Sequence, residues 1–209
     1  MPAVNKRRYH SPLRAEQAAA SRAAVIAAAR ELFVEQGYGA TTLDQVAQRA
    51  GVSKPTVFAA VGSKAELLKV VRDVAMAGDD RPVPVTERED VAAIAAAGDL
   101  DRAVSLTARH IAVVNERYHH VHEVIRGASG TDAVVAALWE TAERERHVGA
   151  GHLLDRLAPG RATASARRRA IDQLWLLMAP DCYHRLVVDR GWSRRAYEQW
   201  LTEGIRLLL

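Results

Sequence analysis

Apolar residues recur at helical spacing along almost the whole chain, and this pattern constrains the fold more than any other feature of the sequence. Val25, Ile26, Ala29, Leu32 and Phe33, for example, fall on one face of a helix. Similar stripes continue to the C-terminus, without strand alternation, a glycine-rich phosphate loop or an internal repeat. The sequence therefore predicts an all-α fold.

Capping residues and helix breakers set the expected boundaries of these helices. We expect helices over about 16–36, 42–50, 53–61, 63–78, 90–97, 100–126, 132–157, 165–189 and 193–208. Pro82 and Pro84 lie in a charged stretch without apolar period, which predicts a loop over 79–90. A turn is expected at 127–130, and Pro180 is expected to kink the helix that contains it.

Charge is divided unevenly along the 209 residues. The net charge is +4, but the chain up to Arg72 holds 11 lysines and arginines against 5 acids, and the remainder holds 18 against 20. A phosphate-binding module joined to a nearly neutral body would show this division. An ordinary solvated surface in an arginine-rich protein is the alternative.

The composition excludes several other classes of protein. Cys182 is the only cysteine, so neither an internal disulfide nor a cysteine-based zinc cluster is expected. The longest apolar runs fall far short of the roughly 20 residues of a membrane span. The basic cluster 6–8 has no apolar segment behind it, unlike a secretory signal. We therefore expect a cytoplasmic protein that does not enter a membrane.

The segment from Thr42 to Val61 has the spacing of a helix-turn-helix. Two short helical stretches are separated by Gly51 and Val52, and Ser53 and Pro55 suit the start of the second stretch. A helix that enters the major groove is held in this way by the helix before it. An ordinary helical hairpin would show the same spacing.

Over about 21–68 the sequence closely resembles the TetR family of transcriptional regulators. The matching residues are Ala29, Leu32, Phe33, Glu35, Gly37, Tyr38, Thr41, Thr42, Val46, Ala47, the run 50–53, Thr56, Val57, Phe58, Ser63, Lys64, Leu67 and Leu68. The resemblance implies a three-helix DNA-binding domain, a larger helical domain for ligand binding and dimerisation, and usually repression that a small molecule relieves. On this basis we expect a basic arm over 1–13, a helix-turn-helix domain over 14–66 and a ligand-binding and dimerisation domain over 67–209.

The second helix of the motif departs from the family pattern. Family members usually carry Tyr at the position of Phe58, His at Ala60 and Phe at Val61, so this helix is poor in hydrogen-bond donors. The sequence predicts a DNA-binding set of Thr42, Asp44, Gln45, Ser53, Lys54, Pro55, Thr56, Phe58 and Lys64. Within it, Lys54 and Thr56 are the polar readers of the second helix, and Phe58 can press on a sugar or a thymine methyl.

The other members of the set have different expected roles. Thr42, at a helix N-terminus, and Lys64, by its charge, are expected to contact phosphates. Asp44 and Gln45 could reach base edges from the first helix. Arg7 and Arg8 in the arm could enter the minor groove, or the arm could be a solubilising tail.

Ligand contacts in the larger domain have to be argued from side chains. The candidates are large or polar residues on otherwise apolar helix faces: His110, Tyr118, His122, Trp139, Trp175, Met178 and Tyr183. Each of them could equally be an ordinary core residue.

Histidines are dense between His110 and His122. His119, His122 and Glu123 share a helix face, which leaves open a second hypothesis, a helical metal-dependent enzyme. A polar helix face with buried, hydrogen-bonded histidines is the simpler interpretation, so we expect neither a metal site nor a cofactor.

The last two expected helices carry much large apolar surface, including Leu174, Leu177, Tyr197, Trp200 and Ile205. Two such pairs can form a four-helix bundle across a two-fold axis, although they could also complete the core of one chain. The sequence thus predicts a homodimeric repressor, released from a palindromic double-stranded DNA operator by a small-molecule effector of unidentified chemistry. A ligand-independent architectural DNA binder is the third possibility.

Overall fold

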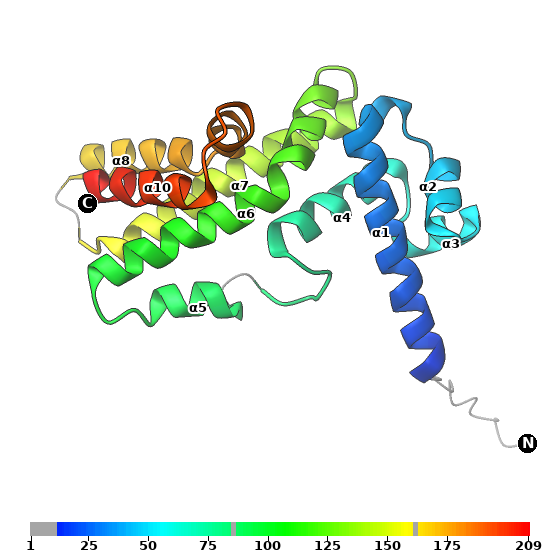
Figure 1. Ribbon diagram of the computed structural model, residues 1–209, viewed down its shortest axis with the longest axis horizontal. Coiled ribbons are helices and arrows are strands. Elements are labelled where there is room, and N and C mark those ends of the chain that lie inside the picture. The colour runs from blue at the N-terminus through cyan, green and yellow to red at the C-terminus, as the bar shows by residue number, and fades with distance from the viewer. Residues whose placement is uncertain (1–11, 85–86, 161–162) are drawn as a thin grey trace, which may run out of the picture. The chain divides into compact units, whose positions relative to one another are not determined.

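The computed structural model describes residues 12–84, 87–160 and 163–209, and all regular elements in these ranges are helical (Figure 1). In chain order they are α1 (Pro12–Ala40), α2 (Leu43–Ala50), α3 (Lys54–Val61), α4 (Lys64–Ala77), α5 (Glu89–Ala95), α6 (Leu100–Ser129), α7 (Ala133–Leu157), α8 (Ala164–Leu177), α9 (Pro180–Tyr183), the π-helix η2 (His184–Asp189) and α10 (Arg194–Leu208). The prediction of an all-α fold is confirmed.

The chain forms two compact units, one ending at Val71 and the other running from Arg72 to Leu209. The division falls inside α4, whereas the sequence placed it between residues 66 and 67. Arg7 and Arg8 of the expected arm lie outside the described residues.

The first unit is a small three-helix core extended by the start of α4. α1 packs against both α2 and α3, and these two short helices pack against each other. The side chains between them are fully buried and apolar: Val25, Ala29, Phe33, Val46 and Val57. Burial of this apolar surface holds α3 at a defined angle to its neighbours.

Local signals in the sequence account for the ends of these helices. Thr42 and Gln45 form the predicted capping box at the start of α2, and Gly51 ends that helix with a φ of 66°. Ser63 and Glu66 cap α4 in the same reciprocal way. Gly37 interrupts α1 where a stop was expected, with a φ of 82°, although a last turn continues to Ala40.

The second unit is built on the long helices α6 and α7. α6 packs against α5, α7, α9 and α10, and α8 packs against α7 and α10. The core of this second unit includes Ile111, Leu154, Leu174, Tyr197 and Leu201. Tyr197, Leu201 and Ile205 are therefore buried within one chain, so most of the apolar stripe of α10 completes the core of its own unit.

Two predicted boundaries in this unit are wrong. α6 continues through Gly127 to Ser129, since one glycine costs a helix only about 1 kcal/mol and packing can offset that. The single kinked helix over 165–189 is instead broken after Leu177, because the residue before a proline favours an extended backbone and Ala179 adopts one (ψ 130°). Among the described helices, none is both long and apolar enough to cross a membrane.

Candidate nucleic-acid interface

α2 and α3 form a helix-turn-helix joined by a three-residue turn. Gly51 takes the left-handed conformation, and the Val52 amide donates to the Ala47 carbonyl at 3.0 Å. The Ser53 side chain accepts from the Thr56 amide, and Pro55 lies in the first turn of α3, where its missing N–H costs no hydrogen bond. The turn therefore fixes where α3 begins and which face it exposes.

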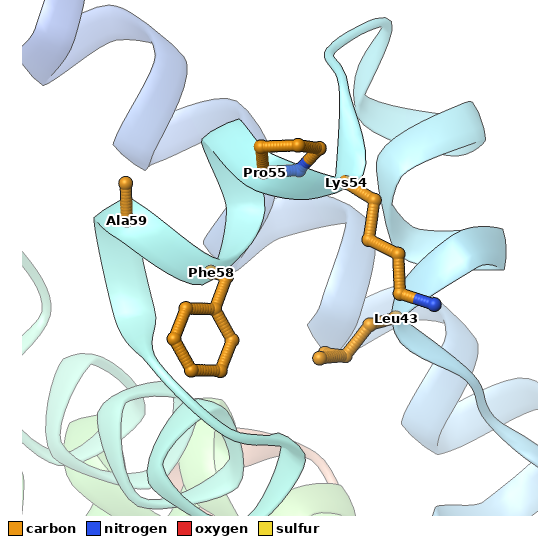
Figure 2. A pocket seen from close by; sticks show the side chains of 5 residues that line it. All are labelled: Leu43, Lys54, Pro55, Phe58 and Ala59. Carbon is orange, nitrogen blue, oxygen red and sulfur yellow. The ribbon is translucent and has the colours of Figure 1, made fainter.

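An open apolar hollow lies on the outer side of this motif, lined by Leu43, Lys54, Pro55, Phe58 and Ala59 (Figure 2). Phe58 is 62% exposed, an unusual position for a large aromatic side chain. Pro55, Phe58 and Ala59 share the face of α3 opposite the buried Val57, so helical spacing could have indicated the hollow. Leu43 and Ala59 also line the hollow but were not among the predicted contacts.

Lys54 and Asp44 form an ion pair across the two helices of the motif, with Nζ 2.8 Å from Oδ2. Both side chains are more than half exposed, so the pair contributes at most about 1 kcal/mol to stability. Lys54 is the cationic member of the hollow, and Asp44 places a negative charge directly beside it.

The other predicted polar residues at the start of α2 and α3 already make hydrogen bonds that shape the motif. The carboxamide oxygen of Gln45 accepts from the Thr42 amide at 2.8 Å and from Gln36 Nε2 at 3.2 Å. The hydroxyl oxygens of Ser53 and Thr56 are 2.8 Å apart. Thr42, Gln45 and Ser53 are exposed and Thr56 is half-buried, so the structure places all four on or beside the outer face.

Lys64 lies further from the solvent than the sequence suggested. Its Nζ donates to the Tyr38 carbonyl at 2.9 Å and lies 4.2 Å from the centre of the Tyr38 ring. Lys64 thus ties the start of α4 to the end of α1, a structural role that sequence reasoning did not anticipate.

In the second unit, three of the predicted ligand contacts lie together on α6 and α7. The His122 ring is 5.6 Å from the Tyr118 ring and 4.9 Å from the Trp139 ring, measured between centroids. His122 is only 1% exposed, and neither of its ring nitrogens has a hydrogen-bond partner among the described residues. Nε2 lies 3.7 Å from a Glu143 carboxylate oxygen, too far for a hydrogen bond.

Two charged residues that sequence reasoning missed connect this cluster to Trp175. Glu143 forms an ion pair with Arg146, whose guanidinium lies 4.7 Å from the Trp175 ring centre and donates to the Trp175 carbonyl. Burial raises the pKa of Glu143, but His122 and Arg146 outweigh that effect and hold the pKa below its usual value. Only their i,i+3 spacing on α7 could have indicated the pair.

The other predicted ligand contacts lie elsewhere. His110 pairs with Asp90 at the opposite end of α6, with Nδ1 2.7 Å from Oδ2. The Tyr183 ring packs against the Tyr197 ring at 5.2 Å, and the Met178 carbonyl accepts from Asn115. His110, Met178 and Tyr183 therefore do not line one site with His122.

Apart from His110, the histidines of α6 divide into two groups. His119 lies with His120 and His184, and His122 lies with Glu123 and Asp181. The combination of His119, His122 and Glu123 that the enzyme hypothesis required is not among the ligand groups found in the described part of the chain. Adjacent turns of α6 direct His119 and His122 toward different partners on α9 and η2.

Comparison with known proteins identifies relatives of similar sequence. The family model described as "Bacterial regulatory proteins, tetR family" matches residues 25–71, which hold the helix-turn-helix. The helix-turn-helix region of the chain is thus similar to that of the TetR family. The HTH-type transcriptional activator FasR of Mycolicibacterium smegmatis is 46% identical over 50 residues, which are 24% of this chain and 23% of FasR. The chain thus matches less than a quarter of the length of that relative.

Solved structures share the fold of the chain at low sequence identity. NalD, the secondary repressor of the MexAB-OprM multidrug efflux pump in Pseudomonas aeruginosa, is 19% identical, with a TM-score of 0.66 over 93% of this chain and 98% of NalD. A TetR/AcrR-family regulator from Aquifex aeolicus is 13% identical, with a TM-score of 0.65 over 90% and 99% of the two chains. The second unit therefore has a known fold, although its sequence identity to these structures is low.

Proposed function

We propose that the chain is a DNA-binding transcriptional regulator that inserts α3 into the major groove. The exposed hollow around Phe58 carries this proposal, because an apolar ring beside Lys54 suits a thymine methyl or a sugar next to a phosphate. The first residues of α2 and α3, Leu43 and Lys54, both line this hollow, so the N-termini of the two helices, which favour anions, lie beside it.

The other predicted contacts complete this interface. Thr42, Gln45, Ser53, Thr56 and Pro55 position or read the duplex, and Lys64 contributes positive charge while holding Tyr38. Arg7 and Arg8, outside the described residues, would add minor-groove contacts. A homodimer would present two copies of α3 to successive major grooves, about 34 to 36 Å apart, and so read a palindrome.

Selection of duplexes from a random-sequence pool by the purified chain tests this proposal. We expect an inverted repeat to be enriched, with an affinity that falls steeply as salt rises. Phe58→Ala should weaken binding to the selected duplex by about tenfold or more without changing the fold, in the range of 1–3 kcal/mol for a good base contact. Val134→Ala is the matched control, because Val134 is also 62% exposed but lies on α7. Equal affinity for every duplex would overturn the proposal.

The second unit would bind the effector at the cluster of Tyr118, His122, Trp139 and Trp175. A buried polar group without a hydrogen-bond partner costs about 1–3 kcal/mol. The indole nitrogen of Trp175 has none among the described residues, and His122 makes only the long 3.7 Å contact with the Glu143 carboxylate. A small aromatic or apolar molecule with one hydrogen-bonding group would relieve this cost. The multidrug-binding protein EbrR, whose structure is similar (TM-score 0.51, 17% identity), has been solved in complex with imidazole.

Screening of small molecules by thermal shift identifies such a ligand, because binding to the folded state alone raises its stability. A hit should lose most of its effect in His122→Leu and keep it in His152→Ala, since His152 is exposed on α7 outside the cluster. A hit that stabilises both variants equally would place the ligand elsewhere.

We propose repression rather than activation, because a dimer that occupies a promoter blocks transcription without any contact with the transcription machinery. FasR is named an activator and NalD a repressor, so the relatives differ on this point. A reporter gene behind the selected duplex should be less expressed when the chain is present, and the effector should restore expression. Increased expression would make the chain an activator.

A further inference from the structure

Three histidine rings meet on the side of α6 that faces η2. His119 and His120 are consecutive on α6, and His184 is the first residue of η2. Each offers one ring nitrogen, and the three nitrogens lie within 4.8 Å of one another. His119 is buried, His184 is half-buried and His120 is exposed, so the group has a buried base and an open side.

The spacing of two of these nitrogens matches a tetrahedral metal site. His119 Nδ1 and His184 Nδ1 are 3.3 Å apart. Zinc binds histidine nitrogen at about 2.0–2.1 Å in tetrahedral geometry, which puts neighbouring ligand nitrogens about 3.3–3.4 Å apart. A small movement of His120, whose ring centre is 3.9 Å from that of His119, would supply a third ligand.

The surroundings of His184 also suit a metal ligand. Asp189 Oδ1 lies 3.6 Å from Nε2, the ring nitrogen that does not face His119. Histidines that ligate a metal almost always present their other N–H to a carboxylate, a carbonyl or water, which fixes the tautomer and orients the ring. On the other side of the group, the Tyr183 ring packs 5.0 Å from the His119 ring and holds it in place.

The π-helix explains how residues so far apart in sequence come together. After the break at Ala179, Pro180 starts a new helix. This helix continues into the wider π-turns of η2, where the Arg190 amide donates to the Arg185 carbonyl. π-helical segments are rare and occur frequently at functional sites. Here the segment carries both His184 and Asp189.

We propose that His119, His120 and His184 bind one divalent cation of the imidazole-preferring class, with zinc as the probe. Three nitrogen ligands leave a fourth position for water, which suits an exchangeable ion better than a closed structural site. The second group, His122 with Glu123 and Asp181, is the weaker candidate, because Arg126 already forms an ion pair with Glu123 at 2.8 Å.

Titration of the chelator-treated full-length chain with Zn²⁺ against a chromophoric chelator tests the site. We expect one tight equivalent per chain, and Co²⁺ should give the visible absorption of tetrahedral coordination. His184→Gln and His120→Gln, which change accessible side chains, should each lower zinc affinity by at least tenfold. Asp189→Asn should lower it by about 10- to 100-fold, the usual effect of removing a carboxylate behind a ligating histidine.

Two controls locate the ion. His152→Ala should bind zinc like the unmodified chain, and so should Glu123→Gln combined with Asp181→Asn. Circular dichroism and melting temperature establish that each variant is folded. No tight equivalent, or one that His184→Gln leaves unchanged, would overturn the proposal and make the contact between His119 and His184 an ordinary hydrogen bond.

Discussion

Lys64 donates to the Tyr38 carbonyl and covers the Tyr38 ring, so one side chain makes two contacts with the end of α1. Both contacts lie within the first unit and involve residues 26 positions apart in the chain. A lysine that the sequence offered only as a phosphate contact is therefore also part of the scaffold of the helix-turn-helix.

Lys64→Ala should lower both stability and DNA affinity. A cation–π contact and a hydrogen bond contribute about 0.5–1.5 kcal/mol each, so we expect a loss of about 1–3 kcal/mol in urea denaturation. DNA binding should weaken for all duplexes alike. Lys69→Ala removes the same charge from an exposed position on α4 and should change stability by less than about 0.5 kcal/mol. Equal stability of the two variants would show that the contacts to Tyr38 contribute nothing.

Asp44→Asn should strengthen binding to any duplex by about three- to tenfold. The substitution removes a negative charge near the phosphates and releases Lys54 from its ion pair, and both changes favour DNA. Fluorescence anisotropy at several salt concentrations measures the effect, with Glu140→Gln on α7 as the charge-matched control. If Asp44 instead accepts from a cytosine amino group, Asp44→Asn would weaken binding to the selected duplex only.

Tyr197 should make the protein sensitive to alkaline pH. Its hydroxyl accepts from Asn115 Nδ2 at 3.0 Å, and burial raises its pKa far above the usual value despite that hydrogen bond. A group whose pKa is higher in the folded state contributes stability below its unfolded pKa, here about 10, and loses that contribution as pH rises further.

Tyr197→Phe should thus be less stable than the unmodified chain at neutral pH, by about 1 kcal/mol for the lost hydrogen bond. The difference should shrink or reverse above about pH 10. Urea denaturation at a series of pH values measures both. A constant difference across the series would contradict the assignment. Burial also raises the pKa values of Tyr118 and Tyr183, so some alkaline sensitivity should remain in the variant.

Leu207→Glu should dissociate the proposed dimer. Leu207 is 88% exposed at the end of α10, and Leu176 on α8 is 57% exposed, which leaves apolar surface for a partner after the core of the unit is complete. A charge buried without a partner costs several kcal/mol, enough to weaken a dimer by about a hundredfold or more. Sedimentation should therefore show a folded monomer that no longer binds the palindrome.

Val134→Glu, at another exposed apolar position, on α7, should remain dimeric. Leu207 is a sharper test than Trp200, because Trp200 is half-buried and stacks on the Tyr197 ring within the same chain. A Leu207→Glu protein that stays dimeric would move the interface away from the end of α10.

How far the sequence predicts each feature depends on whether its cause is local. Thr42 with Gln45, and Ser63 with Glu66, are capping boxes within four residues, so the sequence identifies them directly. A contact of Phe58 with a sugar or a thymine methyl requires an exposed ring, and the ring is exposed.

Features made by distant residues were not predictable in this way. His184 comes to His119 from 65 positions away, across a broken helix that periodicity read as continuous. The contact of Lys64 with Tyr38 was unpredictable for the same reason, since no spacing rule connects the end of α1 with the start of α4. The apolar stripe of α10 indicated burial, but it could not tell the core of its own chain from the surface of a partner.

The open hollow around Phe58 also has a thermodynamic consequence. If it closes on a thymine methyl or a sugar, apolar surface leaves water, and such burial lowers the heat capacity of the complex. Binding would become more exothermic on warming, even though its ionic part is driven by the release of counterions. Part of the affinity would then persist at salt concentrations that suppress the contacts of Lys54 with phosphates. A regulator with so few hydrogen-bond donors on α3 would in this way retain part of its DNA affinity when ionic strength rises.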